Sequence, residues 1–578
     1  MSTLALTAIA RRVIGYLAGG IGVLLLIASA AWWYGESEWG RYESLTPEQA
    51  FADGDFGLQV APLKFILVAP TVSQKALGDS WAQRFGFLRR RDAVDGVCEK
   101  DAPRNLPVGF SVSNRLQGNA TPVPLKFVGL TCATCHSASI GKAGVILGAG
   151  SQTADVIAFT DAYSNAILDP TLTADVILDQ YEKQCPAQEG KIQRLVDGFF
   201  IGQWLSGLRE QLRDNATKYD MPFHGAGLSA AGNIPTGPSR TRPFRSVVRN
   251  TIDFPGQGNV AYSKVPLAAM QGLKKWSQYD GSIGDATVRS LIAVFTSSAT
   301  IPALNERQIS DNVKQAADFT LKLGIDPPLP SLAQAFPDHP APSADLLNKG
   351  RAVYEQQCDR CHGHAEASGW KMPPNMADPS ITPLADIGTD PGRLEFRYND
   401  MLVVALATTF PAADITQQND AIMAKAKEAT DAGDLAAADW WQQASKHLQE
   451  SAAREFPAGH RRAFAVNELA KREGYQNSPI PFAWLRAPYL HNGSVPTMRE
   501  LIGLDERPSQ FCRGNAGYDS DAMGVIAPKP GANGCGADAR FLFDTTQPGN
   551  SNAGHWYPKP GAIPREDLEA LLAYVGTL

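Results

Sequence analysis

One short motif, present twice, constrains this chain more than any other feature. The two copies are Cys132-Ala133-Thr134-Cys135-His136 and Cys358-Asp359-Arg360-Cys361-His362. Both read Cys-x-x-Cys-His, the pattern that attaches c-type haem. The two thiols can bond to the two vinyl groups of one porphyrin, and the histidine can bind its iron as the proximal ligand. The sequence therefore predicts two covalently bound haem c groups and a fold with room for both.

Two other uses of paired cysteines compete with haem. A zinc site and a redox-active dithiol both employ Cys-x-x-Cys. Zinc would need a second pair of ligands, and the chain has no further Cys-x-x-Cys and no His-x3-His. Two complete five-residue motifs arise by chance far more rarely than one, so the pattern favours haem.

The second axial ligand of each iron decides what that iron can do, and the motifs do not supply it. The other histidines are His224, His339, His364, His447, His460, His491 and His555. His491 is favoured as the distal ligand of the second haem, because it lies in a turn-rich, aromatic loop after the second motif. Met498 is the alternative, since thioether ligation is common in electron-transfer cytochromes. The first haem has no evident second ligand.

An apolar run near the amino terminus predicts contact with a membrane. It extends from Val13 to Trp33, about the length that crosses a bilayer as a helix. Arg11 and Arg12 precede it, which places the amino terminus in the cytoplasm and the rest of the chain outside. We expect an anchor over residues 13–34 in a bacterial inner membrane, with the haem groups on the periplasmic side. Cleavage after the small residues 28–30, with release into the periplasm, is the alternative.

Four cysteines lie outside the motifs, namely Cys98, Cys185, Cys512 and Cys535. An even number in an oxidising compartment suggests disulfides, with three possible pairings. Cys512 with Cys535 is favoured because both lie in one Gly-rich stretch and would close a short loop. Free buried thiols are the alternative.

The length of 578 residues exceeds what one hydrophobic core usually supports, and the net charge of −6 argues against a nucleic-acid partner. Proline-dense residues 326–342 are the best linker candidate. We therefore expect a membrane or signal segment over 1–35, a first haem domain over 36–340 and a second over 341–578. The fold class should be mainly α and loop-rich, with the first domain poor in helix and a polar helical insertion over about 412–450 in the second.

Two amphipathic helices are predicted at the ends of the second domain. One begins at Ser343 and leads to Cys358, and the other follows Pro564 with acidic residues in its first turn. In small cytochrome c folds the helix before the haem motif packs across the carboxyl-terminal helix. The second domain is therefore expected to be cytochrome c-like.

Several stretches resemble the di-haem cytochrome family of bacterial di-haem peroxidases and, more closely, rubber oxygenases. They are residues 128–132, 347–362, 487–496, 518–519 and 543–545, and the run from Gly549 to His555. The resemblance implies that His491 completes a bis-histidine relay haem and that the first haem is the reactive one. A covering segment of the first haem would include Arg240, Thr241, Phe244, Trp276, Asp280 and Gly281. Phe244 and Phe254 are candidates to face that haem, with ordinary core packing as the alternative.

Three functions follow as hypotheses. The leading one is an oxidoreductase, peroxidase- or oxygenase-like, whose first haem reacts with peroxide or dioxygen while the second relays electrons from a redox partner protein. The second is a non-catalytic membrane-anchored electron carrier, in which His224 would bind the first iron. The third, oxygenase cleavage of an apolar isoprenoid-type substrate, rests on the resemblance alone.

Overall fold

A computed structural model describes most of the chain. It covers residues 22, 44–94, 96–115, 122–186, 190–219, 236–241, 262–274, 276–284, 289–291, 293–294, 306–373, 380–394, 416–453, 473–536 and 540–578. Two hydrophobic clusters organise these residues. One is built entirely from residues 61–212 and is called the amino-terminal core below. The other, the shared core, runs from Phe51 to Val575.

The amino-terminal core packs around a small antiparallel sheet. Its strands are β1 (Gln59–Pro62), β2 (Phe110–Arg115) and β3 (Pro122–Leu130), with β3 in the middle. Four helices pack on it and on one another, namely α3 (Leu63–Val72), α7 (Val156–Leu168), α8 (Ala174–Gln184) and α9 (Lys191–Tyr219). Aromatic rings fill the space beneath, and Phe159 stacks on Trp81 at 5.4 Å. Large rings with few rotatable bonds make such a core well packed.

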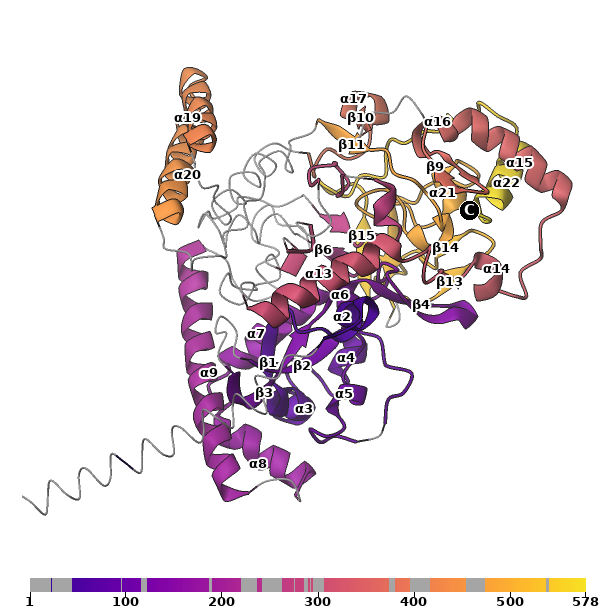
Figure 1. The fold of residues 1–578 in the computed structure, drawn as a ribbon. Coiled ribbons are helices and arrows are strands. Elements are labelled where there is room, and N and C mark those ends of the chain that lie inside the picture. The colour runs from indigo at the N-terminus through magenta and orange to yellow at the C-terminus, as the bar shows by residue number, and fades with distance from the viewer. Residues whose placement is uncertain are drawn as a thin grey trace, which may run out of the picture.

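The expectation of a helix-poor first domain was wrong. Helix α9 alone has 29 residues, and α13 (Arg307–Lys322) has 16 (Figure 1). The apolar residues of α9 are spread around the helix, and Ile192, Leu195 and Phe199 are exposed. Sequence periodicity detects a helix by its apolar face, so a helix without one is missed. In contrast, α13 buries one face that includes Ile309, and Glu306 caps it by accepting from the Ile309 N–H at 3.0 Å.

A buried ion pair fixes α9 against the rest of the amino-terminal core. Lys64 of α3 donates to Asp197 of α9, and both side chains are almost fully excluded from solvent. The ammonium also lies 4.9 Å from the ring centre of Tyr181. Asp197 accepts a further hydrogen bond from Gln193 at 2.7 Å. Each charge is therefore compensated, as burial requires.

Two helices cross in the shared core as the sequence predicted. They are α15 (Ala344–Gln357), whose cap is Ser343, and α22 (Arg565–Val575) at the carboxyl end (Figure 1). Gly350 is at the crossing, where an added Cβ would lie 1.9 Å from the Ala570 carbonyl oxygen. The rings of Tyr354 and Tyr574 meet beside it at 5.4 Å. A residue without a side chain lets the two backbones approach this closely.

The shared core also draws on residues that precede the proline-dense stretch. Phe51 of α2 (Pro47–Asp53) lies 4.9 Å from Phe319 of α13, ring centre to ring centre. Trp484 and Leu571 belong to the same cluster, and so do buried residues of the first Cys-x-x-Cys-His segment. Sequence on both sides of the predicted boundary near residue 340 therefore buries side chains in one common core.

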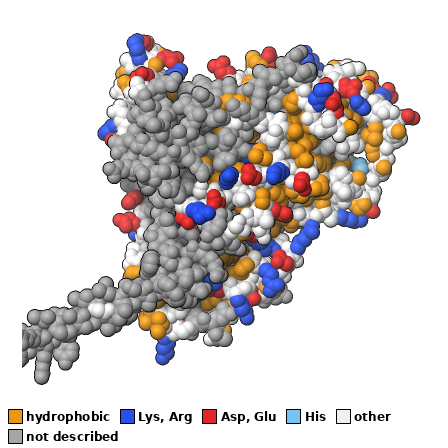
Figure 2. Space-filling model, in the orientation of Figure 1, with side chains coloured by type: hydrophobic (Ala, Val, Ile, Leu, Met, Phe, Trp, Pro, Cys, Tyr) orange, Lys and Arg blue, Asp and Glu red, His pale blue; other side chains and the backbone are white. Residues whose placement is uncertain are grey.

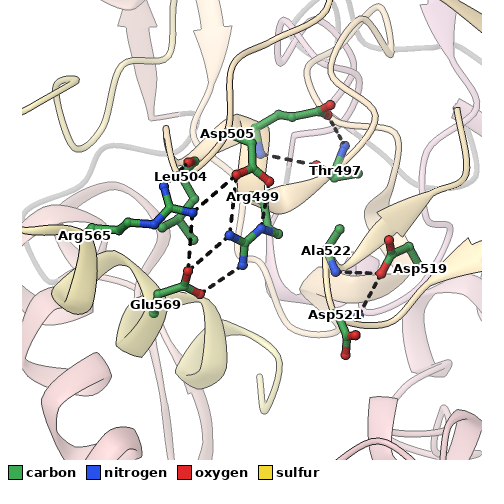
Figure 3. A network of polar contacts seen from close by, with 10 residues as sticks. Thr497, Arg499, Leu504, Asp505, Asp519, Asp521, Ala522, Arg565 and Glu569 are labelled. Atoms are coloured by element: carbon green, nitrogen blue, oxygen red, sulfur yellow. Dashed lines mark hydrogen bonds and ion pairs between the residues drawn. The ribbon is translucent and has the colours of Figure 1, made fainter. Parts of the chain in front are cut away.

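A polar network ties α22 to the short helix α21 (Met498–Leu501) (Figure 3). Arg499 donates to Asp505 at 2.8 Å and to Glu569 at 3.0 Å. Arg565 reaches the Leu504 carbonyl oxygen at 2.7 Å. The network therefore joins the terminal helix α22 to the segment that contains α21.

The polar stretch expected to be helical consists of two helices, α19 (Thr416–Asp431) and α20 (Leu435–Ala453). They form a hairpin that projects from the body in Figure 1. Gly433 makes the turn with φ +74°. The remaining helices are α4 (Trp81–Arg84), α5 (Ala102–Asn105), α14 (Leu332–Ala335), α17 (Leu384–Ile387), and the 3₁₀ turns at 141–143, 271–273 and 483–486. The remaining strands are β4 (Ser137–Ile140), β5 (Gly144–Leu147), β6 (Arg240–Thr241), β7 (Ser263–Lys264), β8 (His364–Glu366), β9 (Gly369–Lys371), β10 (Ile381–Pro383), β11 (Gly474–Gln476), β12 (Gln510–Arg513), β13 (Tyr518–Asp519), β14 (Gly524–Val525) and β15 (Phe541–Asp544).

The predicted membrane anchor cannot be placed in the described structure, whereas the predicted disulfide can. Among the described helices, none is long and apolar enough to cross a bilayer. The predicted anchor over 13–34 lies outside the described residues apart from Gly22. The favoured pairing of Cys512 with Cys535 is confirmed, with the sulfur atoms 2.02 Å apart, and the other two cysteines pair with each other.

Candidate functional site

The first motif folds into a single helical turn, α6 (Cys132–Cys135), directly after β3. Thr131 caps it by accepting a hydrogen bond from the Ala133 N–H at 3.2 Å. Thr134 donates to the Gly109 carbonyl oxygen at 2.6 Å. This turn brings both thiols and the following histidine to one side of the shared core.

His136 is held by one ring nitrogen. Its Nδ1 lies 3.0 Å from the Pro266 carbonyl oxygen, which can only accept. Nδ1 therefore carries the proton, and Nε2 keeps a free lone pair. Burial lowers the pKa of His136 to about 4, so the imidazole is neutral at ordinary pH. A neutral imidazole oriented through Nδ1 is the form that ligates a metal.

The second motif repeats this arrangement on a different scaffold. Helix α15 ends at the motif, and α16 (Asp359–His362) makes its turn. Nδ1 of His362 lies 2.7 Å from the Ser478 carbonyl oxygen. Trp370 donates to the His362 carbonyl oxygen at 2.8 Å, and burial lowers the pKa of His362. This imidazole is thus also neutral and points Nε2 away from its backbone anchor.

The four motif cysteines have no disulfide partner. Burial raises the pKa of Cys132 to about 12, of Cys135 to about 11 and of Cys358 to about 12. A redox-active dithiol requires the opposite, a depressed pKa that yields thiolate. Among the described residues no cluster of three or more histidine, cysteine or acidic side chains could hold a metal, which disfavours zinc. Buried neutral thiols beside an anchored imidazole fit thioether attachment of haem.

Hydrophobic side chains gather on the face of the molecule where Figure 1 places α21 and β14, with charged side chains around them (Figure 2). An apolar patch on an otherwise polar surface usually marks a ligand or partner site.

His555 faces the second motif. Its ring centre is 6.1 Å from that of His362, and the two planes are inclined by 42°. Two imidazoles that ligate one metal from opposite sides at about 2 Å each have ring centres roughly 6 Å apart. Burial, and to a smaller extent the charge of the nearby His362, lowers the pKa of His555 to about 4. Its Nδ1 is buried and has no hydrogen-bond partner in the described structure. The pair therefore fits two axial ligands of one iron.

The loop around His555 is tightly held. Arg507 donates to the Gly554 carbonyl oxygen at 2.8 Å, and its guanidinium lies 3.7 Å from the ring centre of Trp556. Gly554 has φ +77°, and an added Cβ would come within 2.2 Å of the Gly388 carbonyl carbon. The His555 N–H donates to the Ile387 carbonyl oxygen at 2.7 Å. These contacts fix the backbone on both sides of the His555 imidazole.

His491, the residue favoured from the sequence, lies elsewhere. Its ring stacks on that of Tyr475 at 4.4 Å, and its Nε2 is 3.1 Å from the Tyr475 hydroxyl. Burial and then the charges of Arg393, Arg240 and Lys264 lower the pKa of His491 to about 3. The Nε2 atom, which a distal histidine would offer to the iron, is thus already engaged by the Tyr475 hydroxyl. Met498 is buried in the shared core, as a core residue at the start of α21 would be.

The other predicted residues lie partly inside and partly outside the described structure. Arg240, Trp276 and Asp280 are buried, whereas His224, Phe244, Phe254 and His460 lie outside the described residues, as does the side chain of His447. His364 is partly exposed and contacts Asp359 at 2.7 Å, and His339 contacts Asp521 at 2.9 Å. Among the described residues, no histidine ring lies opposite His136 as His555 lies opposite His362.

One family model matches a short segment of the chain. Residues 474–512, from β11 to Cys512, match a family described as RoxA-like, cytochrome c-like. The chain carries a cytochrome c-like domain. The region matched by the cytochrome c-like family includes Ser478, whose carbonyl anchors the His362 imidazole, and the loop of His491.

Two relatives come from Sinorhizobium fredii, and both are uncharacterized. The protein y4iJ is 25% identical over 560 residues, which is 88% of this chain and 86% of the relative. The protein y4iM is 37% identical over 86 residues, 14% of this chain and 20% of the relative. The protein y4iJ therefore matches most of the length of this chain.

Proposed function

We propose that this chain is an exported di-haem c-type cytochrome with one closed relay haem and one reactive haem. Cys132 and Cys135 would attach the first haem, and His136 would be its proximal ligand. Cys358 and Cys361 would attach the second, with His362 as proximal ligand. The cytochrome c-like domain supports a haem-dependent redox role. The apolar run near the amino terminus supports periplasmic placement, anchored in the inner membrane or released, beside a redox partner protein.

The observation that carries this proposal is the difference between the two motifs. His362 has a second imidazole, that of His555, at the separation which a shared iron requires. His555 therefore replaces His491 as the candidate distal ligand. An iron with two imidazoles is coordinatively saturated and suits electron transfer. The first motif has one anchored imidazole, which supports a site where a small oxidant can bind.

Haem, when bound, supplies one-electron chemistry and, at an iron with a free position, binding of peroxide or dioxygen. The chain itself orients the two proximal imidazoles and keeps them neutral. The carbonyls of Pro266 and Ser478 fix the two proximal imidazoles through Nδ1. Burial keeps both imidazoles neutral, so each offers a lone pair. Cys132 and Cys358 both pack against the shared core, which links the two motifs to one hydrophobic cluster.

The test compares two histidine variants of the full chain. Haem content is measured first by the absorbance of the pyridine adduct, and two haems per chain are expected. Electron paramagnetic resonance of the oxidised wild type should then show one high-spin and one low-spin centre. His555→Ala should convert the low-spin signal to high spin, whereas His491→Ala, the matched control, should leave it in place.

Two outcomes would contradict the proposal. Fewer than two haems per chain would remove the di-haem assignment. Loss of the low-spin signal in His491→Ala, with its retention in His555→Ala, would reverse the ligand assignment.

His555→Met is a further variant that keeps a ligand, and the potential of the second haem should rise because thioether ligation favours the reduced iron. Carbon monoxide should bind the reduced wild type at the first haem alone.

A second candidate is an oxygenase that acts on an apolar, isoprenoid-type substrate. The resemblance to the rubber oxygenase branch favours it, and the RoxA-like match is compatible with it. Supplying either hydrogen peroxide or ¹⁸O-labelled dioxygen to the two-haem protein distinguishes the candidates. Peroxide consumption that depends on an electron donor indicates a peroxidase, whereas label in a cleaved isoprenoid indicates an oxygenase.

A further inference from the structure

The first turns of α9 expose three large apolar side chains. Ile192, Leu195 and Phe199 are 80%, 75% and 62% exposed. They follow one another at spacings of three and four residues, so they lie on one face of the helix. We call them the apolar stripe. Single exposed apolar residues are common on proteins, but three together on one helix face indicate a surface that meets a partner.

The apolar stripe lies opposite the face by which α9 packs on the amino-terminal core. Asp197, Ile201 and Leu205 of the same helix are buried. Successive residues of a helix are rotated by 100°, which places these three about half a turn away from the stripe. Further along, the outer face continues with the exposed polar residues Gln203 and Ser206. The apolar surface is therefore confined to the end of α9 that follows α8.

Three exposed lysines belong to the same end of the α8–α9 pair. Lys191 is the first residue of α9, and Lys183 lies in the last turn of α8, which packs on α9. Lys100 follows Cys98 by two residues, and the disulfide from Cys98 to Cys185 holds it near the end of α8. All three lysines are exposed and have no acidic partner in the part of the chain that the structure describes.

The acids nearest to these lysines are already paired. Arg194 forms ion pairs with Asp179 at 2.6 Å and with Glu182 at 2.8 Å. Glu99 forms an ion pair with Lys126 at 3.6 Å. Asp101 is half-buried and can offset one of the three lysines at most. This end of the molecule therefore combines exposed apolar side chains with positive charge that its neighbouring acids do not neutralise.

The size of the apolar stripe argues against a second copy of the chain as its partner. At these exposures the three side chains present roughly 400 Å² of apolar surface, counting about 150–200 Å² for each whole side chain. A stable protein–protein interface buries about 800 Å² on each partner. In a two-fold symmetric pair, moreover, the lysines would face the same lysines of the other copy. Both the area and the charge are therefore unsuited to a dimer.

The surface of a lipid bilayer suits both features. Helices at the membrane interface insert apolar side chains such as Leu and Phe, while lysines attract anionic headgroups. The apolar run from Val13 to Trp33 is expected to enter a bilayer, and residues 34–43 connect it to the described body at residue 44. A connection of this length spans at most about 35 Å. The anchor would therefore keep the body close to the membrane.

We propose that the apolar stripe, together with Lys100, Lys183 and Lys191, docks on a bilayer that contains anionic lipid. This inference rests on the proposed function, in which the chain is exported and anchored. Docking would direct α8 and the start of α9 toward the lipid. The α19–α20 hairpin, which lies beyond the other end of α9, would then be directed away from the membrane (Figure 1).

The test places the photoreactive residue benzoylphenylalanine at position 195 of the full haem-loaded chain. The protein is reconstituted in vesicles of phosphatidylethanolamine and phosphatidylglycerol, irradiated and weighed by mass spectrometry. We expect an adduct heavier by one phospholipid, at a yield at least fivefold above that of the same probe at position 435. Leu435 is the matched control because it is 72% exposed and belongs to the α19–α20 hairpin.

The role of charge is tested in the same assay. The double variant Lys183→Gln and Lys191→Gln should lower the lipid adduct at position 195 about threefold. Vesicles of phosphatidylcholine alone should lower it similarly when the lysines are intact, because the attraction requires both the lysines and the anionic headgroups. A yield that is unchanged in both measurements would overturn the assignment of the lysines to the docking surface.

The remaining outcomes separate this inference from the proposal on which it rests. An adduct of twice the mass of the chain would identify a second copy as the partner and overturn the inference. Equal lipid yields at positions 195 and 435 would also overturn it, whether residues 13–34 are retained or cleaved. An absence of haem from the wild type, measured by the pyridine adduct, would overturn the proposed function, whereas the lipid adduct does not depend on haem.

Discussion

Replacement of Gly350 by alanine tests how closely the helix before the second motif packs on the terminal helix. The new Cβ would lie 1.9 Å from the Ala570 carbonyl oxygen and 2.6 Å from its carbonyl carbon. An unstrained carbon–oxygen contact needs about 3.3 Å, so the helices would have to separate by roughly 1.4 Å. The opposing atoms belong to a helix backbone, which no change of rotamer can move aside.

Two opposing effects determine the change in the free energy of unfolding, namely overpacking at the crossing and the higher helix propensity of alanine. Overpacking of a core typically costs about 1–3 kcal/mol and occasionally more. Alanine in place of a helical glycine returns about 1 kcal/mol. Since the closest atoms belong to the backbone of α22, we expect a net loss of about 2 kcal/mol in the stability of the α15–α22 pair. A loss of that size corresponds to roughly 30-fold faster amide hydrogen exchange in both helices.

Gly207→Ala is the matched control. Gly207 lies in α9, and an added Cβ would meet nothing within 4 Å. This variant should gain about 1 kcal/mol, because only the helix propensity changes. Hydrogen exchange monitored by mass spectrometry on the haem-loaded chain reads both effects locally. Exchange in α15 and α22 that is no faster in Gly350→Ala than in wild type would refute the close crossing at Gly350.

Three further outcomes follow from the structure. Replacing Cys98 and Cys185 by alanine opens a link that spans 87 residues and should cost about 4–5 kcal/mol in urea unfolding under the chain-entropy estimate, more than loss of the shorter disulfide. Lys64→Met should cost about 3–5 kcal/mol by leaving Asp197 buried and unpaired, and the double variant with Asp197→Leu should recover most of that loss in the same assay. Hydrogen bonds from Arg499 lower the pKa of Asp505 below its usual value of 3.8. The stabilisation that Asp505 contributes to the folded state is therefore present above that pH and is lost as the pH falls through the lower folded pKa. Asp505→Asn should flatten the acid limb of a profile of stability against pH.

Local signals in the sequence predicted the elements that depend on local chemistry. The two Cys-x-x-Cys-His turns, the helix capped by Ser343 and the terminal helix after Pro564 all occur where the spacing placed them. The Cys512–Cys535 disulfide was predictable because it closes a short loop. Helix α9 was missed, since a helix without one apolar face carries no periodic signal.

The partner of His362 depended on long-range packing. His491 and His555 are both preceded by turn-forming residues, and the run from Gly549 to His555 was already among the family-like stretches. The distance along the sequence from His362, which exceeds 120 residues for both histidines, does not show which of them lies beside the second motif. The structure decides it, because Arg507 and the close approach of Gly554 to Gly388 hold the His555 loop against α16, whereas Tyr475 covers His491.

The sequence by itself therefore determined the two Cys-x-x-Cys-His turns and the two helices at the ends of the second predicted domain, because these features are encoded within a few consecutive residues. Only the tertiary structure brought Lys100 to the end of α8 through the Cys98–Cys185 disulfide, and only it opposed His555 to His362. Both arrangements depend on contacts between segments that lie far apart in the sequence. Such contacts are selected by how the whole core packs, and that information is not present in any local pattern.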